Sequence, residues 1–354
     1  METASLLVAA NEVAYRNWGY ADETEEALQF LPVRAEGMSI VIPIKVSSLT
    51  SLAGLRESLA KLLAHPFPFE LEVIITDESP DEVFAAIDGW FQHEPRVIHI
   101  CPRDECRTGK NDKLNGIYDA MNHVGYDYVV LVDDHYRLSV DNLDQILSLF
   151  GEYDCFKCMV DFDQTRISSL VDVCGIFIIN LLHPYRQFCG HLCFNLQTIR
   201  EIGFPSRDML FDELGMELQF RKHQKKVHFA DKIFFEAVQK ISWKRFFEQR
   251  LRYAYENFAF PLRFSLFLCV LPLILVCALI GKSFAIGFIA LLTLAVSCLG
   301  LVGQIKYRQG RFPVWTFLLS PVWFWFYPFT TWLAIVYRLR GGVKFGGRKI
   351  LRAV

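Results

Sequence analysis

Residues 127–138 read Asp-Tyr-Val-Val-Leu-Val-Asp-Asp-His-Tyr-Arg-Leu, an apolar run that ends abruptly in two acids and a histidine. The run Tyr128–Val132 predicts a buried strand, because short apolar runs of this length are typical of parallel sheets. Ligands in open α/β sheets bind beyond the carboxyl ends of the strands. Asp133, Asp134 and His135 are therefore candidates for holding a divalent cation, and a polar turn after the strand is the alternative interpretation.

The part of the chain before this run alternates between strand-like and helix-like segments. Strands are predicted at Ser39–Lys45, Leu71–Thr76 and Arg96–Cys101, and helices at Leu52–Ala64, Glu82–Phe91 and Asp112–His123. This alternation predicts a parallel, doubly wound sheet whose ligand crevice lies at the strand ends. The second strand ends at Asp77, so we expect this acid on the same rim as Asp133.

Residues 108–115, Thr-Gly-Lys-Asn-Asp-Lys-Leu-Asn, fall between those two strand ends and resemble half of a phosphate-binding loop. The full Walker spacing is missing. A functional interpretation places Lys110 or Lys113 near the phosphates of a nucleotide. The plain interpretation is a loop that opens a helix.

Two later helices carry candidate functional residues. Asp212 and Glu213 open one predicted helix, where acids also stabilise the helix dipole, so capping is the alternative to catalysis. The other helix, at 242–260, is rich in aromatic and basic residues and contains Gln249, Arg252 and Tyr253.

The pattern after Phe150 is less regular, with one strand predicted at Phe188–Asn195 and a short helix at Thr198–Ile202. This part also contains a CxxC pair followed by a second group of possible ligands: Cys155, Cys158, Cys189, His191 and Cys193. A zinc site is a minor interpretation, because the second group lacks the usual spacing. The 10 Cys of the chain are scattered in apolar surroundings, which favours reduced thiols.

Apolar stretches near the C-terminus make the chain unusually hydrophobic, at 52% of its residues. Leu262–Ile280, Phe284–Val302 and Trp315–Tyr337 are each near the roughly 20 residues that cross a bilayer, so they are predicted membrane segments. The first two have no charge in their apolar cores to mark a transport path, which argues against a transporter.

The resulting domain organisation has five parts. They are a helical N-terminal extension (1–37), a catalytic domain (38–241), an amphipathic interface helix (242–260), membrane segments (261–338) and a basic tail (339–354). The net charge of −2 gives no overall field that would attract nucleic acid, so no nucleic-acid partner is expected.

Taken in order, these motifs resemble those of a membrane-bound family 2 glycosyltransferase over about residues 38–352. The matching positions are the strand Ser39–Pro43, Asp77, the run Gly109, Lys110, Leu114 and Asn115, a DxD-like Asp133, Asp134 and His135, the segment 190–204, the pair Asp212 and Glu213, a QxxRW-like Gln249, Arg252 and Tyr253, and the tail 342–350. The layout is most similar to the ceramide-glucosyltransferase-like and hopanoid-associated branches, in which a catalytic domain precedes a few membrane helices.

Three positions depart from the family's pattern. His135 replaces the second Asp of DxD, Asp-Glu replaces Glu-Asp at 212–213, and Tyr253 replaces the Trp of QxxRW. Imidazole remains a suitable ligand for manganese-type ions, and tyrosine keeps an aromatic face for stacking. The reversed acid pair leaves open which carboxylate is the base.

The resemblance implies a GT-A-like doubly wound mixed sheet followed by transmembrane helices. It also implies inverting, metal-dependent transfer of a sugar from a nucleotide-diphosphate sugar to a lipid or glycan acceptor at the membrane. Mn²⁺ or Mg²⁺ at Asp133 and His135 would neutralise the diphosphate. The residues expected to bind the nucleotide sugar are Asp77, Lys110, Lys113, Asp133, Asp134, Gln249, Arg252 and Tyr253.

The positions of apolar residues along the helix indicate which of the two acids, Asp212 or Glu213, is the catalytic base. Counting from Glu213 places Met216, Leu218 and Phe220 where the family's motif helix carries apolar residues, so Glu213 is the predicted base. Asp212 is the predicted helix cap, because Asp caps better than Glu. A catalytically inactive homologue that serves as a membrane scaffold or partner subunit is the alternative to an enzyme.

The catalytic part is expected to face the cytoplasm, where nucleotide sugars are made, and residues 1–37 contain no signal peptide that would export it. Three full crossings would place the basic tail outside, against the positive-inside rule. A break at Pro321 and Pro328 would instead turn the third stretch into a re-entrant or tilted hairpin and return the tail to the cytoplasm. We favour the hairpin.

Overall fold

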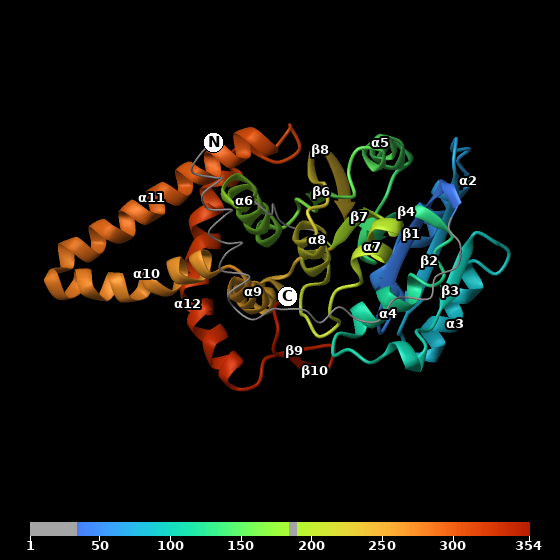
Figure 1. Ribbon diagram of the computed structural model, residues 1–354. Coiled ribbons are helices and arrows are strands. Elements are labelled where there is room, and N and C mark those ends of the chain that lie inside the picture. Colours follow the sequence, from blue (N-terminus) through green and yellow to red (C-terminus); the bar gives the residue numbers. More distant parts are fainter. Residues whose placement is uncertain (1–33, 184–189) are drawn as a thin grey trace.

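The computed structural model describes residues 34–183 and 190–354 (Figure 1). The predicted N-terminal extension falls mostly outside the described residues, as does Cys189. The first strand begins at Arg34, four residues before the predicted domain boundary.

The described chain forms one eight-stranded sheet in the order β3-β2-β1-β4-β7-β6-β8-β5. Its strands are β1 (Arg34–Ile44), β2 (Glu70–Asp77), β3 (Val97–Ile100), β4 (Tyr126–Val132), β5 (Tyr136–Arg137), β6 (Cys155–Phe162), β7 (His191–Asn195) and β8 (Val227–Ala237). The strands β3, β2, β1 and β4 are parallel, and β7 runs antiparallel between β4 and β6. The predicted GT-A-like, doubly wound mixed sheet is confirmed.

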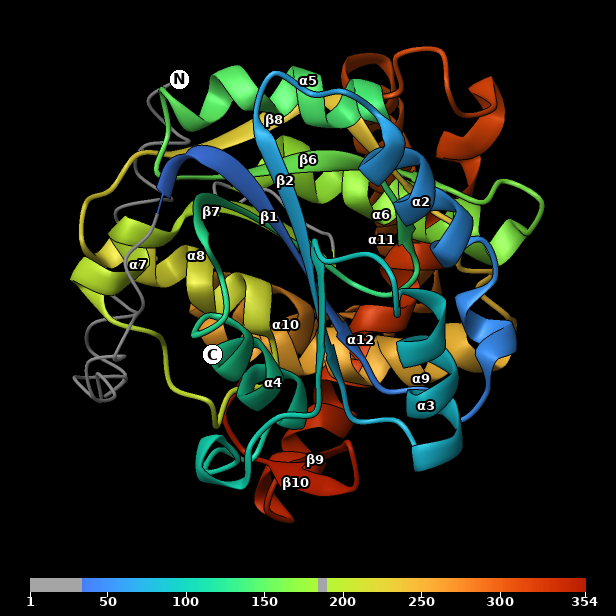
Figure 2. The same cartoon turned by 90° about the vertical axis from the view of Figure 1, so that its right-hand side faces the viewer.

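Helices cover both faces of this sheet (Figure 2). One face packs against α2 (Leu55–Ala64), α3 (Asp81–Trp90) and α5 (Val140–Phe150). The other packs against α4 (Asp112–Ala120), α7 (Leu196–Ile202) and α8 (Asp212–Lys222). Alternating side chains of β1 and β4, such as Ile40 and Val41, enter opposite cores, which explains why these strands are apolar throughout.

The CxxC pair shows the same alternation and does not form a zinc site. Cys155 belongs to the core on the α4 side of the sheet, whereas Cys158 and Cys193 belong to the core on the α2 side. The backbone N–H of Cys158 donates to Nε2 of His191 at 2.9 Å, and burial lowers the pKa of His191 to about 3. The histidine is therefore a neutral core residue.

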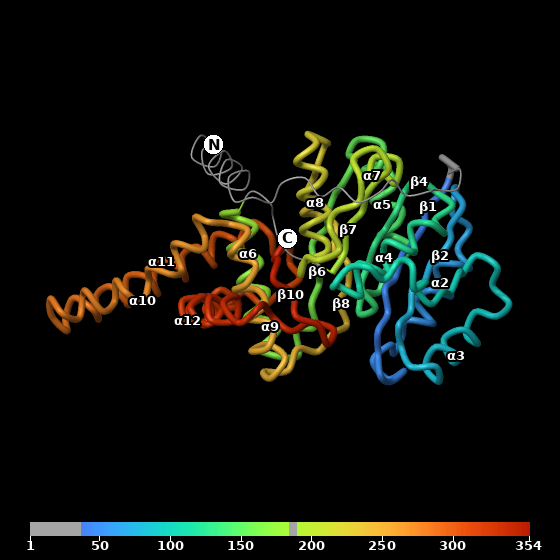
Figure 3. The backbone as a smooth tube through the Cα atoms, turned by 60° about the horizontal axis from the view of Figure 1, so that its bottom comes forward, coloured from blue at the N-terminus to red at the C-terminus, as the bar shows by residue number. Residues whose placement is uncertain are grey.

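A second layer of helices lies between the sheet and the C-terminal apolar hairpin (Figures 1 and 3). It consists of α6 (Ile167–Leu182), α9 (Trp243–Glu256) and α12 (Ser320–Leu339). Beyond it, α10 (Pro261–Ile280) and α11 (Lys282–Tyr307) project away from the sheet as an antiparallel pair. In the described part of the chain, α10 and α11 are the two helices long and apolar enough to cross a membrane.

The third predicted membrane segment differs from these two. Helix α12 continues through Pro328, so the expected break at this residue is wrong, while Pro321 lies in the first turn, where proline is well tolerated. Trp323 and Tyr327 are buried and pack in the cluster that α12 shares with α6 and α9. This helix therefore packs on the side of the α10–α11 pair that faces the sheet.

The chain after α12 returns to the part of the protein that contains the eight-stranded sheet. It forms β9 (Val343–Phe345) and β10 (Arg348–Ile350), and Arg352 then pairs with Met209 in an isolated bridge. The tail therefore lies against the part of the chain that contains the eight-stranded sheet.

Candidate active site

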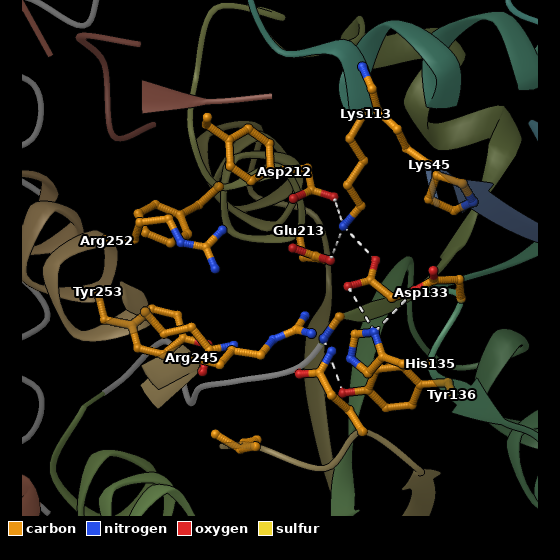
Figure 4. Close-up of a pocket in the computed structure, with 18 of the residues that line it drawn as sticks. Lys45, Lys113, Asp133, His135, Tyr136, Asp212, Glu213, Arg245, Arg252 and Tyr253 are labelled. Carbon is orange, nitrogen blue, oxygen red and sulfur yellow. Dashed lines mark hydrogen bonds and ion pairs between the residues drawn. The ribbon is translucent and has the colours of Figure 1, made fainter. Parts of the chain in front are cut away.

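A cavity of about 770 Å³ opens at the carboxyl ends of β1, β2 and β4 and extends toward α6, α9 and α12 (Figure 4). Its sheet end is polar and includes Asp133, Asp212 and Glu213. Its far end includes apolar side chains from α6 and α12, namely Ile176, Ile179, Trp323 and Tyr327.

Three carboxylates converge on Lys113 at the sheet end. The Nζ atom of Lys113 lies 2.5 Å from Asp133 Oδ1, 2.5 Å from Asp212 Oδ2 and 2.9 Å from Glu213 Oε1. Figure 4 shows the lysine reaching from α4 to acids that come from β4 and α8. The three acids follow Lys113 by 20 to 100 positions in the sequence, and the fold brings them to one point.

Asp133 reaches this point because a glycine lies beside it. A Cβ atom at Gly190 would lie 2.1 Å from Asp133 Oδ2, so the carboxylate occupies the space that any other residue would fill. The backbone N–H of Asp133 also donates to Gly190 O at 2.7 Å. The predicted glycine-containing strand therefore serves to position a site residue.

The phosphate-loop-like segment is held rigidly next to α8. The side chain of Asn115 bonds both backbone groups of Gly109, at 3.0 Å to its N and 2.9 Å to its O. Asn111 caps α4 and donates to Met209 O at 2.9 Å. These bonds explain the Gly-Lys-x-x-x-Leu-Asn spacing, because they connect the loop that precedes Lys113 to the segment that precedes Asp212.

Electrostatics at this point favour a charged lysine and a readily protonated Glu213. Burial lowers the pKa of Lys113, but the charges of Asp133, Asp212 and Glu213 outweigh it and hold that pKa well above its usual value. Burial and the neighbouring Asp212 raise the pKa of Glu213 well above its usual value. A carboxylate with a raised pKa is a stronger base, which suits proton abstraction.

The same acids are the ligand set that a divalent ion would need. Oxygen atoms of Asp133, Asp212 and Glu213 lie within 4.8 Å of one another. Hard carboxylate oxygens suit Mg²⁺ or Mn²⁺. Lys113 occupies the centre of the group, so an ion held there by all three acids would displace its ammonium group.

His135 lies at the edge of this group. Its Nδ1 is 3.9 Å from Asp133 Oδ2 and 3.4 Å from Asp134 Oδ1. All three residues of the DxD-like motif line the cavity. The convergent acids, however, are Asp133 with Asp212 and Glu213, and the sequence pattern did not predict this set.

Helix α9 supplies the opposite wall. Gln249, Arg252 and Tyr253 all line the cavity, as the QxxRW-like spacing predicts. Arg252 lies with its guanidinium 5.5 Å from the ring centroid of Phe345, and the ring of Tyr253 stacks on Phe211 at 6.4 Å. The Oε1 atom of Gln249 is buried and has no hydrogen-bond partner among the described residues.

Two predicted binding residues do not line the cavity. Asp77 is fully buried, where its carboxylate accepts from Ser79 N at 2.7 Å and pairs with His99 at 3.2 Å. Burial raises the pKa of Asp77, but these bonds outweigh it and hold the pKa below its usual value. Lys110 is exposed, and its Nζ lies 3.9 Å from Asp208 Oδ2. Both residues have structural partners in this conformation.

The predicted capping role of Asp212 is wrong. The N-cap of α8 is Phe211, which makes no side-chain capping bond, and the Asp212 carboxylate pairs with Lys113 instead. Asp212 is the first residue of the helix rather than its cap, so its side chain is free to point into the cavity.

Several residues that line the cavity had no sequence signal, among them Lys45, Asp172, Arg245, Arg250, Trp323, Tyr327 and Phe345. Arg245, Gln249 and Arg252 share one face of α9, because they are spaced by four and three residues. Arg245 could therefore have been predicted from the sequence, because it lies one helical turn before Gln249 on the same face.

Arg250 and Asp172, which both line the cavity, form a buried ion pair. Removing one partner of a buried pair leaves an uncompensated charge and costs about 3–5 kcal/mol. We therefore expect Asp172→Ala to lower the free energy of unfolding by about that amount, measured by thermal or denaturant unfolding of the detergent-solubilised chain. Glu105→Ala, which removes the exposed partner of Arg103, should cost less than about 1 kcal/mol. Equal losses in the two variants would contradict the assignment.

No protein-family model and no curated protein matches this chain. Among solved structures, the chain is similar to a mannosyltransferase from Pyrobaculum calidifontis in complex with GDP-Man and Mn²⁺, at 15% identity over 96% of this chain and 87% of that chain, with a TM-score of 0.47. It is also similar to residues 1–349 of S. aureus TarS, at 14% identity over 88% and 95% of the two chains, with a TM-score of 0.45.

A third similar structure is glucosyl-3-phosphoglycerate synthase from Mycobacterium tuberculosis in complex with Mn²⁺, UDP and glucosyl-3-phosphoglycerate. It is 14% identical over 64% of this chain and 80% of that chain, with a TM-score of 0.41. At these identities and TM-scores the likeness concerns architecture, and the chemistry of this chain must be argued from its own residues.

Proposed function

We propose that this chain is an inverting glycosyltransferase that moves a sugar from a nucleotide-diphosphate sugar to a membrane acceptor. The observation that supports it best is the convergence of Asp133, Asp212 and Glu213 at the strand ends, opposite the α9 wall that carries Arg252. This arrangement brings ligands for a cation, a candidate base and a cationic donor of hydrogen bonds into one cavity.

In the proposed reaction, Asp133 would hold Mn²⁺ or Mg²⁺ together with His135 or Asp212, and the ion would supply positive charge next to a diphosphate. Arg252 donates hydrogen bonds to the departing phosphate. Tyr253 and Gln249 complete the wall against which the donor binds. Lys113 would give up its place among the acids to that ion, and its ammonium group would then be available to the diphosphate.

Glu213 acts as the general base. It takes the proton from the acceptor hydroxyl as the hydroxyl oxygen attacks the anomeric carbon and the bond to the diphosphate breaks. One inversion at the anomeric carbon follows from this single in-line displacement. Asp212 holds the neighbouring charge, which keeps the pKa of Glu213 raised.

The acceptor we propose is a lipid, in preference to a polysaccharide. The far end of the cavity is lined by Ile176, Ile179, Trp323 and Tyr327, which suit an acyl or isoprenoid chain. The adjacent α10 and α11 have the length and hydropathy of membrane spans, so this end of the cavity lies next to the proposed bilayer.

We further propose that α10 and α11 cross the membrane once each and that the catalytic domain and the tail share the cytoplasmic side. The backbone bonds between the tail and residues 210–211 support the shared side. Lys306 lies in the last turn of α11, and Arg308 and Arg311 follow it on that side, which agrees with the positive-inside rule.

Cysteine labelling in sealed cells tests this topology. In a background whose exposed Cys101, Cys269 and Cys298 are serine, Leu351→Cys should be protected from an impermeant reagent. Gly281→Cys, between the two spans, should react. Reaction of Leu351→Cys in sealed cells would contradict the even number of crossings.

A catalytically inactive scaffold is the second candidate, and one observation favours it. The Nζ atom of Lys113 already lies among the acids that a metal ion would bind, as in a site that has lost its ion. Release of nucleoside diphosphate from a panel of donor sugars, measured in membranes with Mn²⁺ or with chelator, separates the two. The enzyme releases it from at least one donor and only with metal, whereas the scaffold releases it from none.

A further inference from the structure

The tail that follows α12 reaches the candidate active site, although it lies more than 100 residues after the acids of that site in the sequence. Strands β9 and β10 form an antiparallel hairpin whose turn is Gly346-Gly347, with φ of 56° and 89°. Left-handed glycines in a two-residue turn fit a tight hairpin. Phe345 and Gly346 line the cavity, and Figure 2 shows the hairpin next to α4.

The hairpin contacts the loop that precedes Lys113. Arg348 Nη1 donates to Gly109 O at 3.0 Å and lies 3.7 Å from Asp112 Oδ1. A Cβ atom at Gly346 would lie 3.4 Å from Asp112 Oδ2, so the turn itself is packed on this loop.

The residues after the hairpin contact the segment that precedes the acid pair. The backbone N–H groups of Leu210 and Phe211 donate to Ala353 O at 3.2 and 3.1 Å, and that of Leu210 also lies 3.1 Å from Arg352 O. Ile350 and Ala353 are fully buried. Tyr255, one turn after Leu251 on α9, donates its hydroxyl to Leu351 O at 2.7 Å.

The third contact is with Arg252 itself, whose guanidinium lies 5.5 Å from the ring centroid of Phe345. The tail therefore contacts the loop of Lys113, the start of the Asp212 helix and the arginine of α9. These three parts come from distant regions of the sequence, and the tail contacts each of them.

We propose that Phe345, Arg348 and the backbone carbonyl groups of Arg352 and Ala353 are positioning groups of the active site. They hold the Lys113 loop, the acid pair at 212–213 and Arg252 at fixed separations, and Phe345 and Gly346 close that side of the cavity. This inference rests on the proposed function, because its test measures the rate of sugar transfer. It predicts that loosening the tail lowers the rate of the chemical step, because misplacing catalytic groups by about 1 Å costs about 100-fold.

Arg348 and Lys349 offer a matched pair for the test. Both are basic residues of β10, but Arg348 contacts the loop whereas Lys349 donates to Arg340 O within the tail. We expect Arg348→Ala to lower kcat about 10-fold, Arg348→Lys to recover part of the loss, and Lys349→Ala to change kcat less than twofold. The unfolding temperatures of the three variants should agree. If Arg348 only stabilised the fold, Arg348→Ala would instead unfold at a lower temperature than Lys349→Ala.

Deleting residues 352–354 removes the carbonyl groups that accept hydrogen bonds from the backbone N–H groups of Leu210 and Phe211. We expect kcat to fall about 100-fold, while the Kd of UDP or GDP measured with Mn²⁺ changes less than threefold. Full activity in both the deletion and Arg348→Ala, in a preparation whose parent chain transfers sugar, would overturn the inference. A parent chain that transfers no sugar and binds neither nucleotide would instead overturn the proposed function.

Discussion

Glu213→Gln should abolish sugar transfer, with a loss of roughly 100- to 10,000-fold in kcat, because removing a general base costs that much. The substitution keeps the size and the hydrogen-bonding capacity of the side chain, so binding of the nucleotide sugar should remain. Kinetics of transfer and calorimetric titration with the donor measure the two effects separately.

The neighbouring acid is the control. Asp212→Asn also removes a charge from the group around Lys113 but keeps the proposed base, so it should be the milder change. A dead Asp212→Asn with an active Glu213→Gln would place the base one residue earlier. Because the pKa of Glu213 is raised by burial and by Asp212, activity should fall as the pH drops through that raised pKa. The acid limb of the pH profile should therefore lie above the usual Glu value of about 4.3.

Asp133→Asn should have an effect of similar size. Asp133 is common to both metal sites considered, the predicted one with His135 and the observed group with Asp212 and Glu213. Loss of an ion that contributes several kcal/mol to charge stabilisation lowers the rate about 1,000-fold or more. Transfer rates at increasing Mn²⁺ concentration measure the loss, which added metal should not restore.

Two controls separate the ligand sets. His135→Ala should raise the Mn²⁺ concentration needed for half-maximal activity if His135 is a ligand, while His135→Asp should retain part of the activity. Unchanged metal dependence in His135→Ala would leave Asp133 with the acids of α8 as the site. Asp134→Asn should have the smallest effect of the three, since Asp134 is not part of the convergent group.

The first half of the fold was predictable from the sequence because its strands are buried on both faces. Continuous apolar runs such as Ile40–Ile42 and Val129–Val132 mark them clearly, and the polar residues after them mark the rim. The acids of α8 were also found, because an acid pair at a helix start is a compact local signal.

Other parts could not be predicted, for physical reasons. Helix α6 is buried around nearly its whole circumference, so it shows no amphipathic period. Asp77 ends a strand at the rim, as predicted, but its partners Ser79 and His99 hold it away from the cavity. The positions of Lys113 among the acids and of Phe345 near Arg252 depend on tertiary contacts between distant segments, which no local pattern encodes.

Transfer of labelled sugar to an organic-extractable lipid tests the central proposal most directly. Membranes that contain the parent chain should form this product from at least one nucleotide-diphosphate sugar with Mn²⁺ present, and should form none with chelator or with Glu213→Gln. The absence of lipid-linked sugar across the donor panel, with donor binding intact, would contradict the proposal and favour the scaffold.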